Sequence, residues 1–106
     1  MVAFKHISVA ALAADIAAAT PVVVLDVRDP GSFSAGRIAG AVRLDNQSVP
    51  QFLQGADKDA KTVVCCYHGN SSQSAAQFLA EHGFTDAYSL DGGMAQWALS
   101  QPCDQD

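Results

Sequence analysis

The sequence has 106 residues, of which 49% are hydrophobic, and its formal net charge is −5. This length is enough for one domain that buries a core without disulfides or metals, and the hydrophobic content excludes a disordered chain. The negative charge argues against nucleic acids and anionic membranes as partners. No run of residues approaches the roughly 18 apolar positions that a membrane span needs.

The cysteines indicate a reducing compartment. Cys65 and Cys66 are adjacent and Cys103 lies near the C-terminus, so these three form no disulfide framework. The N-terminus has no long apolar run behind a positive region, so no signal peptide is expected. Free cysteines without a leader predict a cytoplasmic protein.

The first part of the chain alternates between strand and helix signals. Residues 4–7 form a short strand, and Ser8 can cap a helix that ends before Pro21. Residues 22–27 are apolar on both faces, as in a parallel strand covered on both sides. Residues 29–36 begin with an N-cap and a proline, which predicts a short helix.

The alternation continues to the C-terminus. A short strand is expected at 41–44, a short helix at 48–55 and a buried strand at 62–65. A longer helix that a glycine stops follows at 72–83, then a last strand at 87–90 and a final helix after Gly93. We assign residues 1–100 to one domain and expect 101–106 to be a frayed polar tail. This order of elements predicts an α/β fold with a parallel sheet between helices. In such folds ligands bind beyond the carboxyl ends of the strands.

Cys66 stands where such chemistry is expected. It ends a buried strand, a short polar loop follows, and a helix begins at about Ser72. Free amides and the dipole at a helix N-terminus favour an anion. Gly69 lets the loop turn its amides inward. A thiolate would be stabilised there, so Cys66 is a candidate nucleophile, the alternative being an inert residue at the end of a strand.

Neighbouring residues have simpler interpretations. Cys65 must face away from Cys66 along the strand, so we assign it a buried structural role. His68 is a candidate general base, but we favour a histidine that only shapes the loop or contacts the substrate. The three histidines are scattered and the paired cysteines lack ligand spacing, so no metal site or other cofactor is predicted.

The loop Cys66-Tyr67-His68-Gly69-Asn70-Ser71-Ser72 resembles the active-site loop of single-domain thiosulfate sulfurtransferases of the rhodanese family. Three further segments, in the family's order, resemble its other signatures: 25–29, 36–41 and 90–97. The resemblance implies a five-stranded parallel sheet in a three-layer α/β/α arrangement.

The resemblance also implies an activity. Cys66 would take the outer sulfur of thiosulfate, release sulfite, and pass the sulfur from its persulfide to cyanide or a thiol. The amides of residues 67–71 (Tyr67, His68, Gly69, Asn70 and Ser71) would bind substrate, Ser71 adding a hydroxyl, with Ser72 supporting the loop. Asp26 and Arg28 would lie near the loop. We favour a structural pair that anchors the loop over a direct catalytic role, and Arg28 would also help to bind the substrate. A protein persulfide is an alternative donor, and a protein could also be the acceptor.

Two other functions remain open. Phosphatases and arsenate reductases of this fold have a loop one residue longer that ends in arginine. Here the sixth residue after Cys66 is Ser72, and no arginine follows Cys66. Serine cannot supply the bidentate contact that phosphate needs. A non-enzymatic interaction module is the second alternative, and the presence of Cys66 in a complete loop disfavours it.

Overall fold

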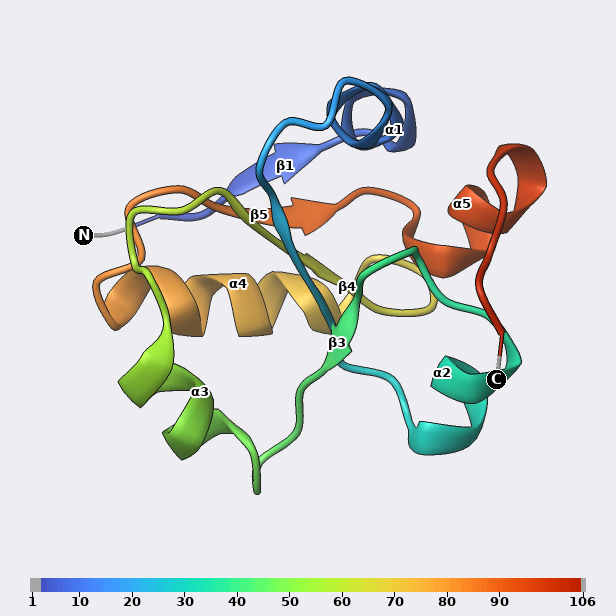
Figure 1. Ribbon diagram of the computed structural model, residues 1–106. Coiled ribbons are helices and arrows are strands. Elements are labelled where there is room, and N and C mark those ends of the chain that lie inside the picture. Colours follow the sequence, from blue (N-terminus) through green and yellow to red (C-terminus); the bar gives the residue numbers. More distant parts are fainter. Residues whose placement is uncertain (1–2, 106) are drawn as a thin grey trace.

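The structure is a computed structural model, and it describes residues 3–105. Its centre is a five-stranded parallel sheet with the strand order β1-β5-β4-β2-β3 (Figure 1). The strands are β1 (Lys5–Ile7), β2 (Val23–Asp26), β3 (Val42–Arg43), β4 (Thr62–Cys65) and β5 (Ala87–Leu90). The predicted parallel sheet is therefore confirmed, with strand bounds within one or two residues of those expected.

Five helices connect and cover the strands: α1 (Val9–Ala17), α2 (Pro30–Ala35), α3 (Val49–Gly55), α4 (Ser71–Glu81) and α5 (Gly93–Ser100). Helices α1 and α5 lie on one face of the sheet, and α3 and α4 lie on the other (Figure 1). The two predicted N-caps form. The Ser8 hydroxyl accepts a hydrogen bond from the amide of Ala11, and the Asp29 carboxylate accepts one from the amide of Ser32.

The core has two parts because the sheet is covered on both sides. Leu12, Val63 and Trp97 belong to the part beneath α1 and α5. Leu25 and Leu79 belong to the part beneath α3 and α4. Every residue of β4 is buried, as the run of apolar residues after Thr62 predicts for a central parallel strand. The chain therefore leaves the middle of the sheet at Cys66, at the edge where ligands bind in such folds.

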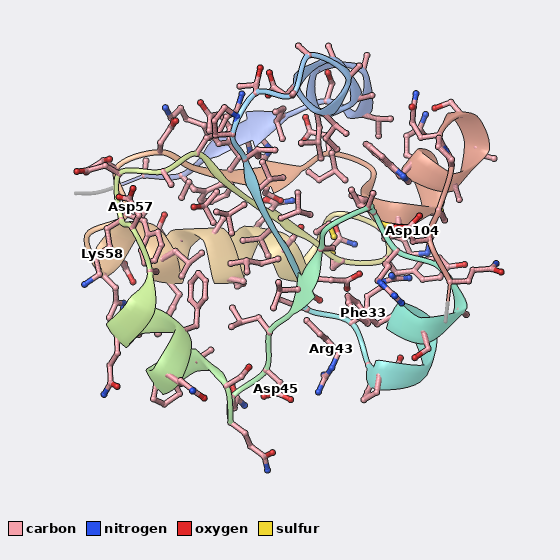
Figure 2. All side chains as sticks on the ribbon, viewed as in Figure 1. Phe33, Arg43, Asp45, Asp57, Lys58 and Asp104 are labelled. Carbon is pink, nitrogen blue, oxygen red and sulfur yellow. The ribbon has the colours of Figure 1, made fainter. Side chains whose placement is uncertain are left out.

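The expectation of a frayed C-terminal tail is wrong for the described part of it. The backbone of Asp104 exchanges two hydrogen bonds with that of Arg37, at 3.0 and 2.8 Å. Trp97 Nε1 donates to the carbonyl of Pro102, and Cys103 packs against the first part of the core. Figure 2 shows Asp104 on this returning segment. The tail is held because its backbone groups find partners, which its polar composition did not indicate.

Candidate active site

Cys66 lies at the end of β4 with its sulfur turned into a ring of hydrogen-bond donors. The amide of Gly69 donates to its Sγ atom at 3.1 Å, and the amide of Ser72 donates at 3.3 Å. The hydroxyl of Ser72 lies 3.4 Å from the same atom. The residue is only 5% exposed, so these donors meet the sulfur with little competition from water.

Gly69 makes this turn possible. Its φ of +90° lies in the region that L side chains rarely adopt. A Cβ on this residue would also lie 3.0 Å from the backbone nitrogen of Gly92 and 3.2 Å from the carbonyl oxygen of Leu90. The sequence argument for a glycine here is confirmed.

The N-terminus of α5 holds the loop from the other side. The amide of Met94 donates to the carbonyl of Cys66 at 2.8 Å, and the amide of Ala95 donates to that of Tyr67 at 2.9 Å. These bonds use the free amides of the first helical turn. They fix the direction of the loop peptides, so that the carbonyls point to α5 and the later amides of the loop point to the sulfur.

The pKa values of the two adjacent cysteines are shifted in opposite directions. Burial alone would raise the pKa of Cys66, but hydrogen bonds from the Ser72 hydroxyl and from the amides of Ser72, Gly69 and His68 outweigh it, so the pKa is lowered. Burial, followed by the negative charge of Asp26, raises the pKa of Cys65 far above that of an ordinary thiol. Cys65 has no exposed surface and lies in the core, which confirms its predicted buried role.

Ser72 does more than support the loop, the role expected for it. Its amide and its hydroxyl both reach Sγ, and the hydroxyl also bonds to that of Ser89 at 2.8 Å. Both serines are fully buried. Ser72 is the second residue of α4, where the amide is free to bind an anion, so the helix N-terminus and the side chain act on the same atom.

Asp26 and Arg28 form a buried pair beside the loop. Nε of Arg28 donates to both carboxylate oxygens of Asp26, at 3.0 and 3.1 Å, and its terminal NH2 group donates to Oδ2 at 2.7 Å. That NH2 group also donates to the carbonyl of Gly36. Their side chains are 0% and 10% exposed. The geometry is that of a structural anchor, the interpretation favoured from the sequence, and a substrate contact by Arg28 stays a prediction.

The other loop residues border two cavities. Tyr67 is 56% exposed, lies in a tilted ring contact with His68 with centroids 4.6 Å apart, and lines a cavity of about 500 Å³. Ser71 lines a second cavity, of about 570 Å³, on the side of α3 and α4. Asn70 precedes α4, and its side chain makes no capping bond. The predicted substrate contacts of these residues stay predictions.

Comparison with known proteins identifies the family of this chain. The sequence model described as "Rhodanese-like domain" matches residues 8–100. The chain belongs to the rhodanese family.

Relatives named thiosulfate sulfurtransferase GlpE are similar to this rhodanese over most of its length. One from Pseudomonas fluorescens is 58% identical over 80 residues, which cover 76% of this chain and 73% of the relative. One from Pseudomonas putida F1 is 56% identical over 82 residues, 77% and 74% of the two chains. Among solved structures, a rhodanese-related protein from Thermoplasma volcanium has a TM-score of 0.82 at 28% identity, covering 97% of this chain and 100% of its own.

Sequence reasoning missed two features of this rhodanese site. Gly93 was interpreted only as the boundary of the final helix, although its missing side chain lets α5 lie against the loop. Ser89 was overlooked, and its signal was a hydroxyl in a strand position next to apolar Leu90, on the face that Ala87 shares. Within residues 3–105, no three metal-binding side chains are grouped, and no helix is long and apolar enough to cross a membrane.

Proposed function

We propose that the chain is a thiosulfate sulfurtransferase in which Cys66 carries the transferred sulfur as a persulfide. Its family membership and the names of its relatives support this activity. The observation that carries it is the convergence of the Gly69 amide, the Ser72 amide and the Ser72 hydroxyl on one cysteine sulfur. Donors in this arrangement stabilise negative sulfur, first as a thiolate and then as a persulfide.

In the first half of the reaction, the Cys66 thiolate attacks the outer sulfur of thiosulfate. A sulfur–sulfur bond forms to Cys66, the bond inside thiosulfate breaks, and sulfite leaves with its electron pair. The loop amides of residues 67–71 would hold the anion while this occurs, and Ser71 would add its hydroxyl. The pKa of Cys66 lies below that of an ordinary thiol, so the nucleophile is present in larger amount near neutral pH.

In the second half, an acceptor attacks the outer sulfur of the persulfide. Cyanide yields thiocyanate and a thiol yields a new persulfide, and in both cases the Cys66 thiolate leaves. No cofactor takes part. We assign the activity to a domain of residues 1–100, and the free cysteines fit a reducing, cytoplasmic setting. A protein persulfide remains an alternative donor to thiosulfate.

A thiosulfate-to-cyanide assay on the wild-type chain and on Cys66→Ser tests the proposal. The wild type should form thiocyanate, and after thiosulfate alone its mass should increase by one sulfur atom. Cys66→Ser should lose both signals, while Cys103→Ser, which changes a cysteine away from the loop, should keep them. A wild-type chain that gains no sulfur would rule the proposal out.

The same samples separate the alternatives. A phosphatase would hydrolyse p-nitrophenyl phosphate, but the loop offers Ser72 where a guanidinium is needed, and all three arginines of the sequence precede Cys66. An interaction module would show neither activity. We expect thiocyanate formation without phosphate release.

A further inference from the structure

We propose that Ser89 is a positioning residue for sulfur transfer: its buried hydroxyl directs the proton of Ser72 toward Cys66 and so strengthens the hydrogen bond to negative sulfur. The two hydroxyl oxygens are 2.8 Å apart, and that of Ser72 is 3.4 Å from Sγ. The inference rests on the proposed role of Cys66 as the nucleophile.

The available partners of the two hydroxyls decide which of them donates along the row of hydrogen bonds from Ser89 through Ser72 to Cys66. Within residues 3–105, Ser72 is the only hydrogen-bond partner of the Ser89 side chain. When Cys66 is a thiolate, Ser89 donates to Ser72 and Ser72 donates to Sγ, so every proton has an acceptor. When Cys66 is a thiol that donates to Ser72, the Ser72 proton turns to Ser89, and the Ser89 proton then has no acceptor. These buried hydrogen bonds are therefore better satisfied when the sulfur of Cys66 is negative than when it is neutral.

Ser89 strengthens the contact that Ser72 makes. A hydroxyl that accepts one hydrogen bond donates a stronger one, and the gain is about 10–30% for each bond in a chain. The strand supplies the rigidity, since Ser89 pairs with Val64 on β4 and with His6 on β1. Ser89 does not touch the sulfur, so its effect must pass through Ser72.

The charges around Cys66 do not compete with this effect. The surrounding elements and the loop carry a small set of titratable or charged groups: Cys65 on β4, Asp26 on β2 with its partner Arg28 just after it, His6 on β1, Tyr88 on β5, Asp91 after β5, Glu81 at the far end of α4, and Tyr67 and His68 in the loop. Helix α5 carries none. None of these groups is altered by exchanging the Ser89 side chain, so a change in the titration of Cys66 would report the hydroxyl.

Ser89→Thr and Ser89→Val form a matched pair, because their side chains have the same shape and only the first has a hydroxyl. The measurement is the pH dependence of iodoacetamide modification of Cys66, followed by fragment masses that distinguish it from Cys65. We expect Ser89→Thr to titrate within about 0.2 units of the wild type and Ser89→Val about 0.5 units higher. Equal pKa values for the pair would overturn the proposal.

The dependence on Ser72 is a second requirement. In a Ser72→Ala background, the two Ser89 variants should titrate together, since the hydroxyl that connects them to sulfur is gone. A difference that survives there would also overturn the proposal. Thermal unfolding checks each variant. If either β-branched variant does not fold, Ser89→Ala, which lacks the hydroxyl, is compared with the wild type, which has it, and equal pKa values for these two would overturn the proposal. Iodoacetamide needs no thiosulfate, so a failure of the proposed function, seen as no persulfide on Cys66, is recognised separately.

Discussion

Gly93 lies so close to the backbone of Cys66 that there is no room for a side chain between them. A Cβ on Gly93 would lie 2.5 Å from the carbonyl oxygen of Cys66 and 2.6 Å from that of Tyr67. The φ of Gly93 is +59°, in the left-handed region. The first turn of α5 can therefore approach the sulfur loop closely enough for the amides of Met94 and Ala95 to bind those two carbonyls. The geometry of the nucleophile depends on a helix 27 positions further along the chain.

Gly93→Ala is expected to damage both stability and sulfur transfer. The new methyl group must displace backbone atoms, and the left-handed conformation adds strain, so the free energy of unfolding should fall by about 2–4 kcal/mol. The loop should lose its hold on Sγ, and thiocyanate formation should fall at least tenfold even where the protein remains folded. Urea unfolding and the cyanide assay measure the two effects.

Gly40→Ala is the control for that experiment. Its φ of +79° imposes a similar backbone strain, but a Cβ there would meet no atom within 4 Å. We expect a loss of about 1–2 kcal/mol and little change in activity. Equal activity losses in the two variants would show that the close approach of α5 is unimportant.

The rate of persulfide formation should follow the ionisation of Cys66. The pKa of this thiol is lowered, so the rate should reach half its maximum at a pH below the value of about 8.5 for an ordinary cysteine. Below that midpoint, the rate should fall about tenfold per pH unit as the thiolate is protonated. Sulfite release in a single turnover gives the profile. A midpoint at or above the ordinary value would contradict the geometry of the donors.

His68 offers a check on which groups set this profile. Its amide helps to lower the pKa of Cys66, and its ring makes a tilted contact with that of Tyr67. His68→Asn keeps the amide. Because hydrogen bonds to the sulfur set the midpoint of the rate profile, we expect it to stay within about 0.3 pH units of the wild type. Loss of the pH dependence in this variant would make the ring a general base.

Arg28→Lys should weaken the fold more than it weakens substrate binding. Lysine cannot reproduce the fork that meets both oxygens of Asp26, which is wholly buried, so we expect a loss of about 1–3 kcal/mol in unfolding free energy. The KM for thiosulfate should change less than about threefold. Arg43→Lys is the matched control, because its pair with Asp45 is partly exposed and should contribute under about 1 kcal/mol. A rise in KM of tenfold or more would make Arg28 a substrate ligand.

Local signals in the sequence were enough to predict most of the elements and the position of the nucleophile. The contacts that they did not predict join residues far apart in the sequence. Cys66, Gly69 and the start of α4 follow one another within a few residues, so capping rules and strand periodicity located them. The Ser72–Ser89 bond, the docking of α5 on the loop and the pairing of Asp104 with Arg37 join positions that are 17 or more residues apart. Nothing in the local pattern of a polar segment says which distant backbone will accept its amides.

The C-terminal segment gives the last prediction. Deleting residues 101–106 removes the two backbone bonds between Arg37 and Asp104 and the bond from Trp97 to Pro102, so the unfolding free energy should fall by about 2–4 kcal/mol. Asp104→Pro removes only the amide that donates to Arg37 and should cost about 1–2 kcal/mol. Asp104→Ala keeps both backbone bonds and should stay within about 0.5 kcal/mol of the wild type. Urea unfolding followed by Trp97 fluorescence measures all three, and equal stability of the deletion and the wild type would mean that this segment does not hold the fold.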